Sequence, residues 1–186
     1  MKRSLHFIFF VFFAANCFAQ FSKTHYVPPL ISASGMVEDH YLYISTPSLT
    51  NVNFKIIQNG GSVIYGTVSS SSPYQYDIGS GEYTQLFTPI NKTGIVANKG
   101  YVIEAEDLIY VSVRVNAGRT NSGSYNHAGG LVSKGNSALG NTFRLGAMLN
   151  PLFDTTLLNF ASILATENGT KITISDLQNG TKLLDG

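Results

Sequence analysis

Apolar and polar residues alternate along most of this chain, in the period-two pattern of half-buried β-strands. The clearest run is 108–116, where one face is aliphatic and the other mostly polar: Ile109, Val111, Val113 and Val115 against Tyr110, Ser112, Arg114 and Asn116. The same pattern predicts further strands at 41–46, 52–56, 62–68, 84–88, 101–105, 142–149, 160–166 and 171–175. Helical spacing is rare, which indicates an all-β protein.

Short turn signals connect several of these runs. Asn59-Gly60 and Asn168-Gly169 each stand between two predicted strands, and a type I′ hairpin turn needs positive φ at both central residues. Glu106-Asp107 fits a third tight turn, between 101–105 and 108–115. Connections this short join antiparallel neighbours.

We therefore predict an antiparallel β-sandwich-like domain with Greek-key or repeated-hairpin organisation. A β-propeller-like assembly of repeats is the alternative, because 41–57 and 160–174 resemble two copies of one hairpin. The predicted core combines apolar residues of several runs: Val52, Phe54, Ile56, Ile109, Val111, Val113, Val115, Phe143, Leu145, Ile163, Ile172 and Ile174.

One segment, 116–141, breaks the alternation and is rich in glycine and polar residues. An irregular segment of this length is often functional, and polar loops held between rigid strands carry recognition. We predict that ligand contacts come from six of its residues: Arg119, Asn121, Tyr125, Asn126, His127 and Lys134. The alternative is that the glycines only let the segment cross back over the sheet.

The N-terminus has the layout of a secretory signal peptide over residues 1–19. Two basic residues precede an apolar run, and small residues then stand at the −3 and −1 positions before a predicted cleavage between Ala19 and Gln20. The apolar run is shorter than the ~20 residues of a membrane span. We expect export to the cell surface or the extracellular space, with no membrane span after signal removal. The alternatives are an N-terminal anchor and lipid attachment at Cys17.

The remaining residues, 20–186, are predicted to form one all-β surface domain that is incomplete at its C-terminal end. Asn179-Gly180 opens another hairpin, but only a few residues follow it.

The amino-acid composition limits the classes of ligand that the chain is expected to bind. The chain has 12 Lys and Arg against 11 Asp and Glu; removal of Lys2 and Arg3 with the signal leaves 10 against 11, a net charge of −1. A near-neutral surface argues against nucleic acid and anionic membranes. Cys17 is the single cysteine, so residues 20–186 can form neither disulfides nor thiolate metal sites.

Residues that could carry catalysis are few. No Gly-x-Ser-x-Gly elbow is present, and His25, His40 and His127 are expected to be isolated surface side chains. The acidic clusters at 38–40 and 104–107 do not follow the calcium-loop spacing. We expect no enzymatic activity, no cofactor and no metal.

Four blocks resemble the N-terminal domain of the IgGFc-binding-protein type: NKGYVIEAEDLIYVSVRVN at 98–116, HAGGLVSKG at 127–135, ALGNTFR at 138–144 and ILATENGTKITI at 163–174. Bacterial versions stand at the front of large surface proteins of gliding Bacteroidetes, which often end in a gliding-motility-associated or type IX sorting domain. The resemblance implies an adhesin-like function and no catalytic residues. It does not imply antibody binding.

Taken together, these features favour a non-catalytic, secreted cell-surface adhesion or interaction module, the N-terminal part of a larger bacterial surface protein, with an extracellular protein or glycan as ligand. The alternative is a carbohydrate-binding domain attached to a secreted polysaccharide-active enzyme. Exposed Tyr and Asn could stack on and hydrogen-bond sugars, although the chain has no Trp.

Overall fold

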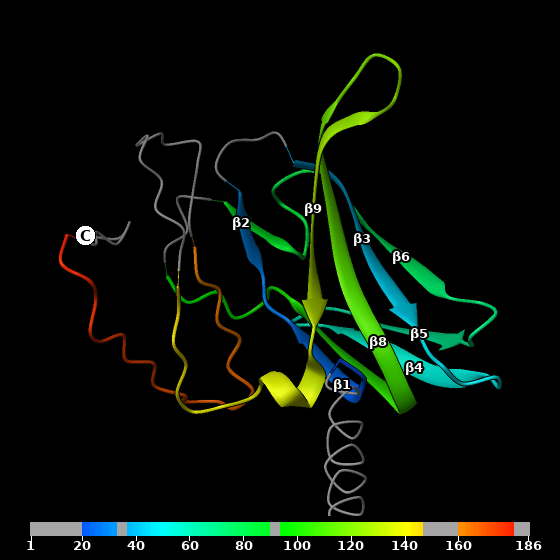
Figure 1. Cartoon of the computed structure of the whole chain (residues 1–186), viewed down its shortest axis with the longest axis horizontal. Coiled ribbons are helices and arrows are strands. Elements are labelled where there is room, and N and C mark those ends of the chain that lie inside the picture. Colours follow the sequence, from blue (N-terminus) through cyan, green and yellow to red (C-terminus); the bar gives the residue numbers. More distant parts are fainter. Residues whose placement is uncertain (1–19, 33–36, 90–93, 147–159, 181–186) are drawn as a thin grey trace, which may run out of the picture.

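The computed structural model describes residues 20–32, 37–89, 94–146 and 160–180. Strands between residues 22 and 133 form an antiparallel sheet curled around one long strand (Figure 1). The predicted signal peptide 1–19 lies outside the described residues, and so does the end of the chain after residue 180.

The long strand is β8 (Tyr101–Arg119), and it has neighbours on both edges. Its first part pairs with β1 (Ser22–Val27) and β4 (Val52–Gln58). Its second part pairs with β3 (Val37–Ser45) and β9 (Tyr125–Ser133). All four pairings are antiparallel, so β8 is the axis that both parts of the sheet share.

Shorter strands complete the sheet. β5 (Val63–Val68) pairs with β4 and β6 (Tyr74–Gly79) pairs with β3, which gives the order β5-β4-β8-β3-β6. A small parallel sheet joins β2 (Leu30–Ser32) to β7 (Phe87–Pro89). Among the described residues the one helical element is a 3-10 turn, η1 (Gly135–Ala138). The predicted antiparallel all-β class is confirmed, as a half-barrel-like curled sheet with a small second sheet.

The predicted tight turn at Glu106-Asp107 is wrong, because β8 runs through these residues without a break. Odd-numbered residues face the core on both sides of this point, as Ile103 and Ile109 do, so one strand keeps both runs in register. The exposed Glu106 instead receives a hydrogen bond from Asn53, with 2.9 Å between Nδ2 and Oε2.

The Asn59-Gly60 hairpin between β4 and β5 is confirmed. Gly60 has a φ of +72°, and the N–H of Gln58 donates to the carbonyl oxygen of Ser62 at 3.0 Å. The resemblance between 41–57 and 160–174 does not reflect two copies of a hairpin. β3 and β4 pair with β8 and not with each other, and the second run contains no strand.

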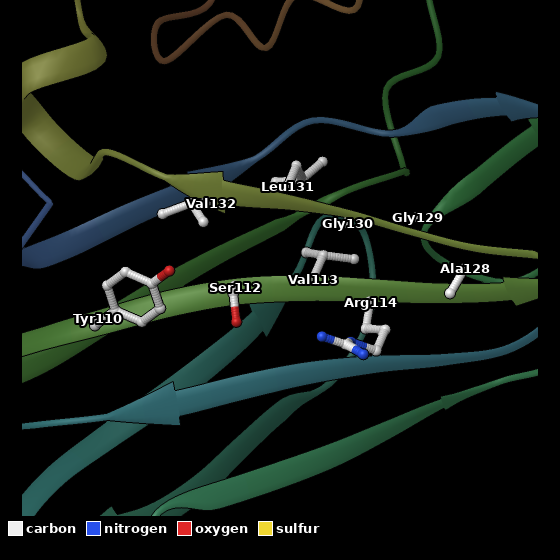
Figure 2. A pocket seen from close by; sticks show the side chains of 9 residues that line it. All are labelled: Tyr110, Ser112, Val113, Arg114, Ala128, Gly129, Gly130, Leu131 and Val132. Atoms are coloured by element: carbon white, nitrogen blue, oxygen red, sulfur yellow. The ribbon is translucent and has the colours of Figure 1, made fainter.

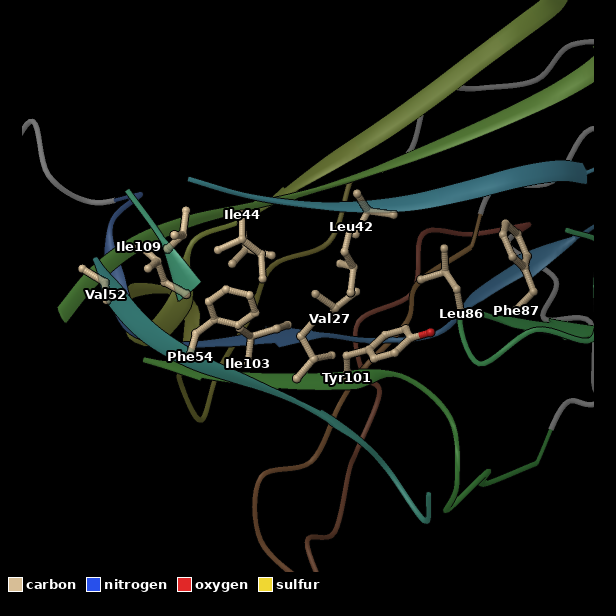
Figure 3. Close-up of a cluster of buried hydrophobic side chains, with 14 residues drawn as sticks. Val27, Leu42, Ile44, Val52, Phe54, Leu86, Phe87, Tyr101, Ile103 and Ile109 are labelled. Atoms are coloured by element: carbon tan, nitrogen blue, oxygen red, sulfur yellow. The ribbon is translucent and has the colours of Figure 1, made fainter. Parts of the chain in front are cut away.

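Buried side chains from β1, β3, β4 and β8 converge inside the curl (Figure 3). The predicted core is confirmed for the residues of β4 and β8, with Val115 partly buried against it: Val52, Phe54, Ile56, Ile109, Val111 and Val113 are buried. The predicted register of β8 is therefore correct.

Five other predicted core residues are exposed, and this part of the prediction is wrong: Phe143 (59%), Leu145 (66%), Ile163 (47%), Ile172 (49%) and Ile174 (56%). No strand forms in 142–146, 160–166 or 171–175, although a turn forms at Asn168-Gly169. Alternation identifies a segment that could form a strand, but the segment is buried only when a neighbouring strand pairs with it.

Candidate functional site

The predicted loop 116–141 is largely a β-hairpin, so the prediction of an irregular loop is wrong. β8 continues to Arg119, a tight turn spans 120–124, and β9 returns along β8. The turn closes with the N–H of Thr120 donating to the carbonyl oxygen of Ser124 at 2.7 Å. Glycines within β9 lack the side chains that would reveal the alternation, which is why the sequence pattern missed this strand.

One of those glycines is required by close packing. A Cβ on Gly130 would lie 2.8 Å from the carbonyl oxygen of Val113, whereas Gly129 has open space around it. Gly130 pairs with Arg114, so the absence of a side chain leaves the sheet hollow beside Arg114.

The hairpin gathers five of the six predicted site residues at its tip, and Arg119, Asn121, Asn126 and His127 are exposed there with a half-buried Tyr125. Lys134 is not among them. It follows the far end of β9, nine residues after Tyr125, a distance of roughly 30 Å along an extended chain.

Two acidic residues of β3, Glu38 and Asp39, hold the hairpin tip through hydrogen bonds. The N–H of Arg119 donates to Oε2 of Glu38 at 2.7 Å, and the hydroxyl of Tyr125 donates to Oδ2 of Asp39. The Arg119 guanidinium carbon lies 5.9 Å from the centre of the Tyr125 ring, within cation–π range. The hydrogen bond to Asp39 raises the pKa of the Tyr125 phenol, and burial adds a smaller effect in the same direction. Arg119 and Tyr125 therefore have structural roles in holding the hairpin.

A shallow trough of about 350 Å³ lies between β8 and β9, on the face of the sheet opposite to the core (Figure 2). Along β8 it is lined by Tyr110, Ser112 and Arg114, with Ser112 in the middle (Figure 2). Along β9 it is lined by residues 128–132, which combine the bare backbone of two glycines with the apolar side chains of Ala128, Leu131 and Val132. The trough is open beside Arg114 because Gly130, which pairs with it, has no side chain, whereas Ser112 pairs with Val132.

The polar groups lining the trough form no hydrogen bonds with other described residues. Within the described part of the chain, neither the hydroxyls of Tyr110 and Ser112 nor the guanidinium of Arg114 has a hydrogen-bond partner, and the one ion pair there is between Lys55 and Glu104. These groups stand two residues apart on one strand, so they point to the same face.

Aromatic rings surround this row. The ring centres of Phe21 and Tyr110 are 6.1 Å apart, and those of Tyr41 and Tyr43 on β3 are also 6.1 Å apart. Tyr43 pairs directly with Ser112, and Tyr41 with Arg114. The sequence pattern assigns Tyr110, Ser112 and Arg114 to the outer face but not to a site; the signal was a Tyr-x-Ser-x-Arg triplet, and the pairing of Arg114 with Gly130 appears only in the structure.

Two of the three histidines are buried, so the expectation of isolated surface side chains is wrong for His25 and His40. Nε2 of His25 lies 2.9 Å from the carbonyl oxygen of Ile109; since a carbonyl only accepts, this nitrogen carries the proton. Nε2 of His40 lies 3.0 Å from the carbonyl oxygen of Gly81. Burial lowers the pKa of both imidazoles. They stabilise the fold, and neither lines the trough.

The described residues contain no group of three or more His, Cys, Asp or Glu side chains placed to hold a metal ion. Within the same ranges, no helix is long and apolar enough to cross a membrane.

No family model and no curated protein matches the chain. A solved structure from Thermotoga maritima, described as Thermotoga maritima 1070, aligns with 60% of this chain and 92% of its own at 12% sequence identity and a TM-score of 0.31. A similarity of this size says nothing about what this chain binds.

Proposed function

We propose that this chain is a non-catalytic module of the cell surface that binds an extracellular ligand through the β8–β9 hairpin. The observation that carries the proposal is the row of Tyr110, Ser112 and Arg114, whose polar groups line a trough and have no hydrogen-bond or ion-pair partner among the described residues. Groups held on paired strands keep their geometry before a ligand arrives, which lowers the entropic cost of binding.

The position of the hairpin supports this function. Among the described strands β9 pairs with β8 alone, and its residues 126–130 are exposed. The tip extends beyond the rest of the sheet, where it can reach a partner (Figure 1). The carboxylates of Glu38 and Asp39 on β3 accept hydrogen bonds from the hairpin, so the hairpin is held in place while its tip stays accessible.

The proposed export and cell-surface location are supported by the sequence. Residues 1–19 and the four family-like blocks support export and placement at the front of a larger bacterial surface protein of the gliding, type IX-sorted kind. Two of those blocks, 98–116 and 127–135, include most of β8 and β9, so the resemblance covers the strands that form the trough.

Binding of the mature chain to surfaces tests the proposal. Labelled protein is applied to an array of extracellular-matrix proteins and glycans, beside an Ala128→Phe variant that narrows the trough from an exposed position and a Lys171→Gln control outside it. We expect binding to at least one surface, its loss in Ala128→Phe at an unchanged melting temperature, and no change in Lys171→Gln. Binding to none of the surfaces, or binding that survives Ala128→Phe, would contradict the proposal.

The tip is tested separately, by deleting Ser122–Tyr125 together with His127→Ala. Loss of binding at an unchanged melting temperature would place ligand contacts at the tip as well. A lowered melting temperature would assign the tip to stabilisation of the hairpin.

Export is tested by N-terminal sequencing of the secreted form, which we expect to begin at Gln20. A mature N-terminus at a lipid-modified Cys17 would contradict cleavage after Ala19 and establish a lipoprotein.

A further inference from the structure

We infer that the trough between β8 and β9 binds an acidic polysaccharide, with a sugar ring against Tyr110 and a carboxylate or sulfate group on Arg114. This inference rests on the proposed binding function and names the chemical class of its ligand.

The charge of the trough is the first argument. The guanidinium of Arg114 is exposed and has no ion-pair partner among the described residues. Carboxylates on the neighbouring strands β3 and β6 accept hydrogen bonds from other groups: Asp77 from the N–H of Gly79 at 2.9 Å, Asp39 from Tyr125, and Glu38 from Arg119. An anion bound beside Arg114 meets an exposed guanidinium with a planar fork of donors, which matches the oxygens of a carboxylate or sulfate.

Tyr110 supplies a surface for a sugar. Its ring is half-buried against Phe21, with 6.1 Å between the ring centres, and its hydroxyl has no hydrogen-bond partner among the described residues. An aromatic ring with a polar tip suits a ligand that has an apolar C–H face and a hydroxyl edge. Ser112 lies between Tyr110 and Arg114 and can exchange a hydrogen bond with a sugar hydroxyl (Figure 2).

The shape of the trough favours a chain over a compact molecule or a peptide. Tyr110 and Arg114 are four residues apart on one strand, which spans roughly 13 Å. On the β9 side Gly129 and Gly130 expose backbone, and among the described lining residues only Val132 adds an exposed large apolar side chain, which gives the anchoring side chain of a peptide little to pack into. A linear glycan with repeated hydroxyls and acidic groups fits this shallow, polar lining.

The test measures binding of the mature chain to four polymers by affinity electrophoresis and calorimetry: an alginate oligosaccharide with carboxylates, dextran sulfate, neutral dextran, and poly-glutamate as an anionic polymer without sugars. We expect binding to alginate, to dextran sulfate or to both, and none to dextran. Arg114→Gln, at an exposed position, should weaken binding about tenfold. Lys171→Gln removes an equal charge outside the trough and should leave affinity unchanged. The polymer that binds distinguishes carboxylate from sulfate recognition.

Three outcomes would overturn the inference: equal binding to dextran, equal effects of Arg114→Gln and Lys171→Gln, or binding of poly-glutamate as tight as that of both anionic glycans. If no polymer binds while Ala128→Phe still abolishes surface binding, the ligand class is wrong and the proposed function stands. If Ala128→Phe also has no effect on surface binding, the proposed function fails as well.

Discussion

The imidazole of His25 and the hydroxyl of Ser133 lie 3.1 Å apart in the interior, although 108 residues separate them in the chain. His25 belongs to β1 and Ser133 ends β9, and the other ring nitrogen of His25 reaches β8 through the carbonyl oxygen of Ile109. Because Nε2 of His25 carries the proton, its Nδ1 accepts from the Ser133 hydroxyl, whose oxygen also lies 3.2 Å from the carbonyl oxygen of Tyr26. One buried histidine thus joins three strands at the base of the β8–β9 hairpin.

Removal of this contact should weaken the whole domain. We expect Ser133→Ala to lower the free energy of unfolding by about 1 kcal/mol, since it deletes a buried hydrogen bond. In a double-mutant cycle with His25→Leu, the two changes should couple by roughly 0.5 kcal/mol or more. Urea denaturation measures both values, with exposed Ser124→Ala as the matched control. Additive effects at the two positions would contradict the contact.

Stability should fall in mild acid. Burial holds the pKa of His25 and His40 below the ordinary value of 6.5, so the unfolded chain binds more protons than the folded chain below that pH. Their contribution is complete above pH 6.5 and is lost as the pH falls toward the lower pKa of the folded state, by at most about 1.4 kcal/mol per pH unit for each imidazole. Urea midpoints between pH 8 and pH 5 test this. A midpoint that stays constant over that range would contradict it.

Two tyrosines in ring contact should respond differently to loss of the hydroxyl. The hydroxyl of Tyr101 is buried without a hydrogen-bond partner among the described residues, and burial raises its pKa, so Tyr101→Phe should leave stability unchanged or raise it by about 1 kcal/mol. The hydroxyl of Tyr76 accepts from Nε2 of Gln58 at 2.9 Å, so Tyr76→Phe should destabilise. Melting temperatures compare the pair, and the reverse order would show that Tyr101 has a partner such as a bound water.

The effect of an introduced carboxylate on stability should depend on whether the substituted side chain is buried or exposed. Val113 is 2% exposed, so Val113→Asp should cost several kcal/mol by placing an unpaired carboxylate in the core. Ile172 is 49% exposed, so Ile172→Asp should change stability by about 0.5 kcal/mol or less. Thermal unfolding measures the difference. Similar losses at both positions would mean that the 171–175 segment is buried in solution.

The adjacent glycines of β9 provide a matched pair. Gly130→Ala should destabilise, because its Cβ would lie 2.8 Å from the carbonyl oxygen of Val113. Gly129→Ala meets open space and should stabilise by up to about 1 kcal/mol, since alanine restricts the unfolded chain. Equal responses in denaturant would contradict the close approach of β8 to Gly130.

The sequence pattern predicted the strands whose apolar faces are buried, and it failed where the decisive feature was not hydrophobicity. β3, β4 and β8 were recognisable because alternating side chains face a core. β9 was not recognisable, since its glycines carry no side chains that could alternate. The burial of His25 could not be predicted either, because it depends on two groups distant in sequence, the hydroxyl of Ser133 and the carbonyl oxygen of Ile109. The segment 171–175 alternates without a partner strand. The trough needs β8 and β9 side by side, which no local pattern in either strand specifies.

The sharing of β8 between both parts of the sheet has a consequence for hydrogen exchange. Its two ends pair with different strands, so separating either part from β8 removes core contacts that the other part needs. The central amides of β8 should therefore exchange only through global unfolding, whereas amides at the tip of β9 should exchange through local opening. Tension on the hairpin would pass along one continuous backbone into the most protected part of the domain.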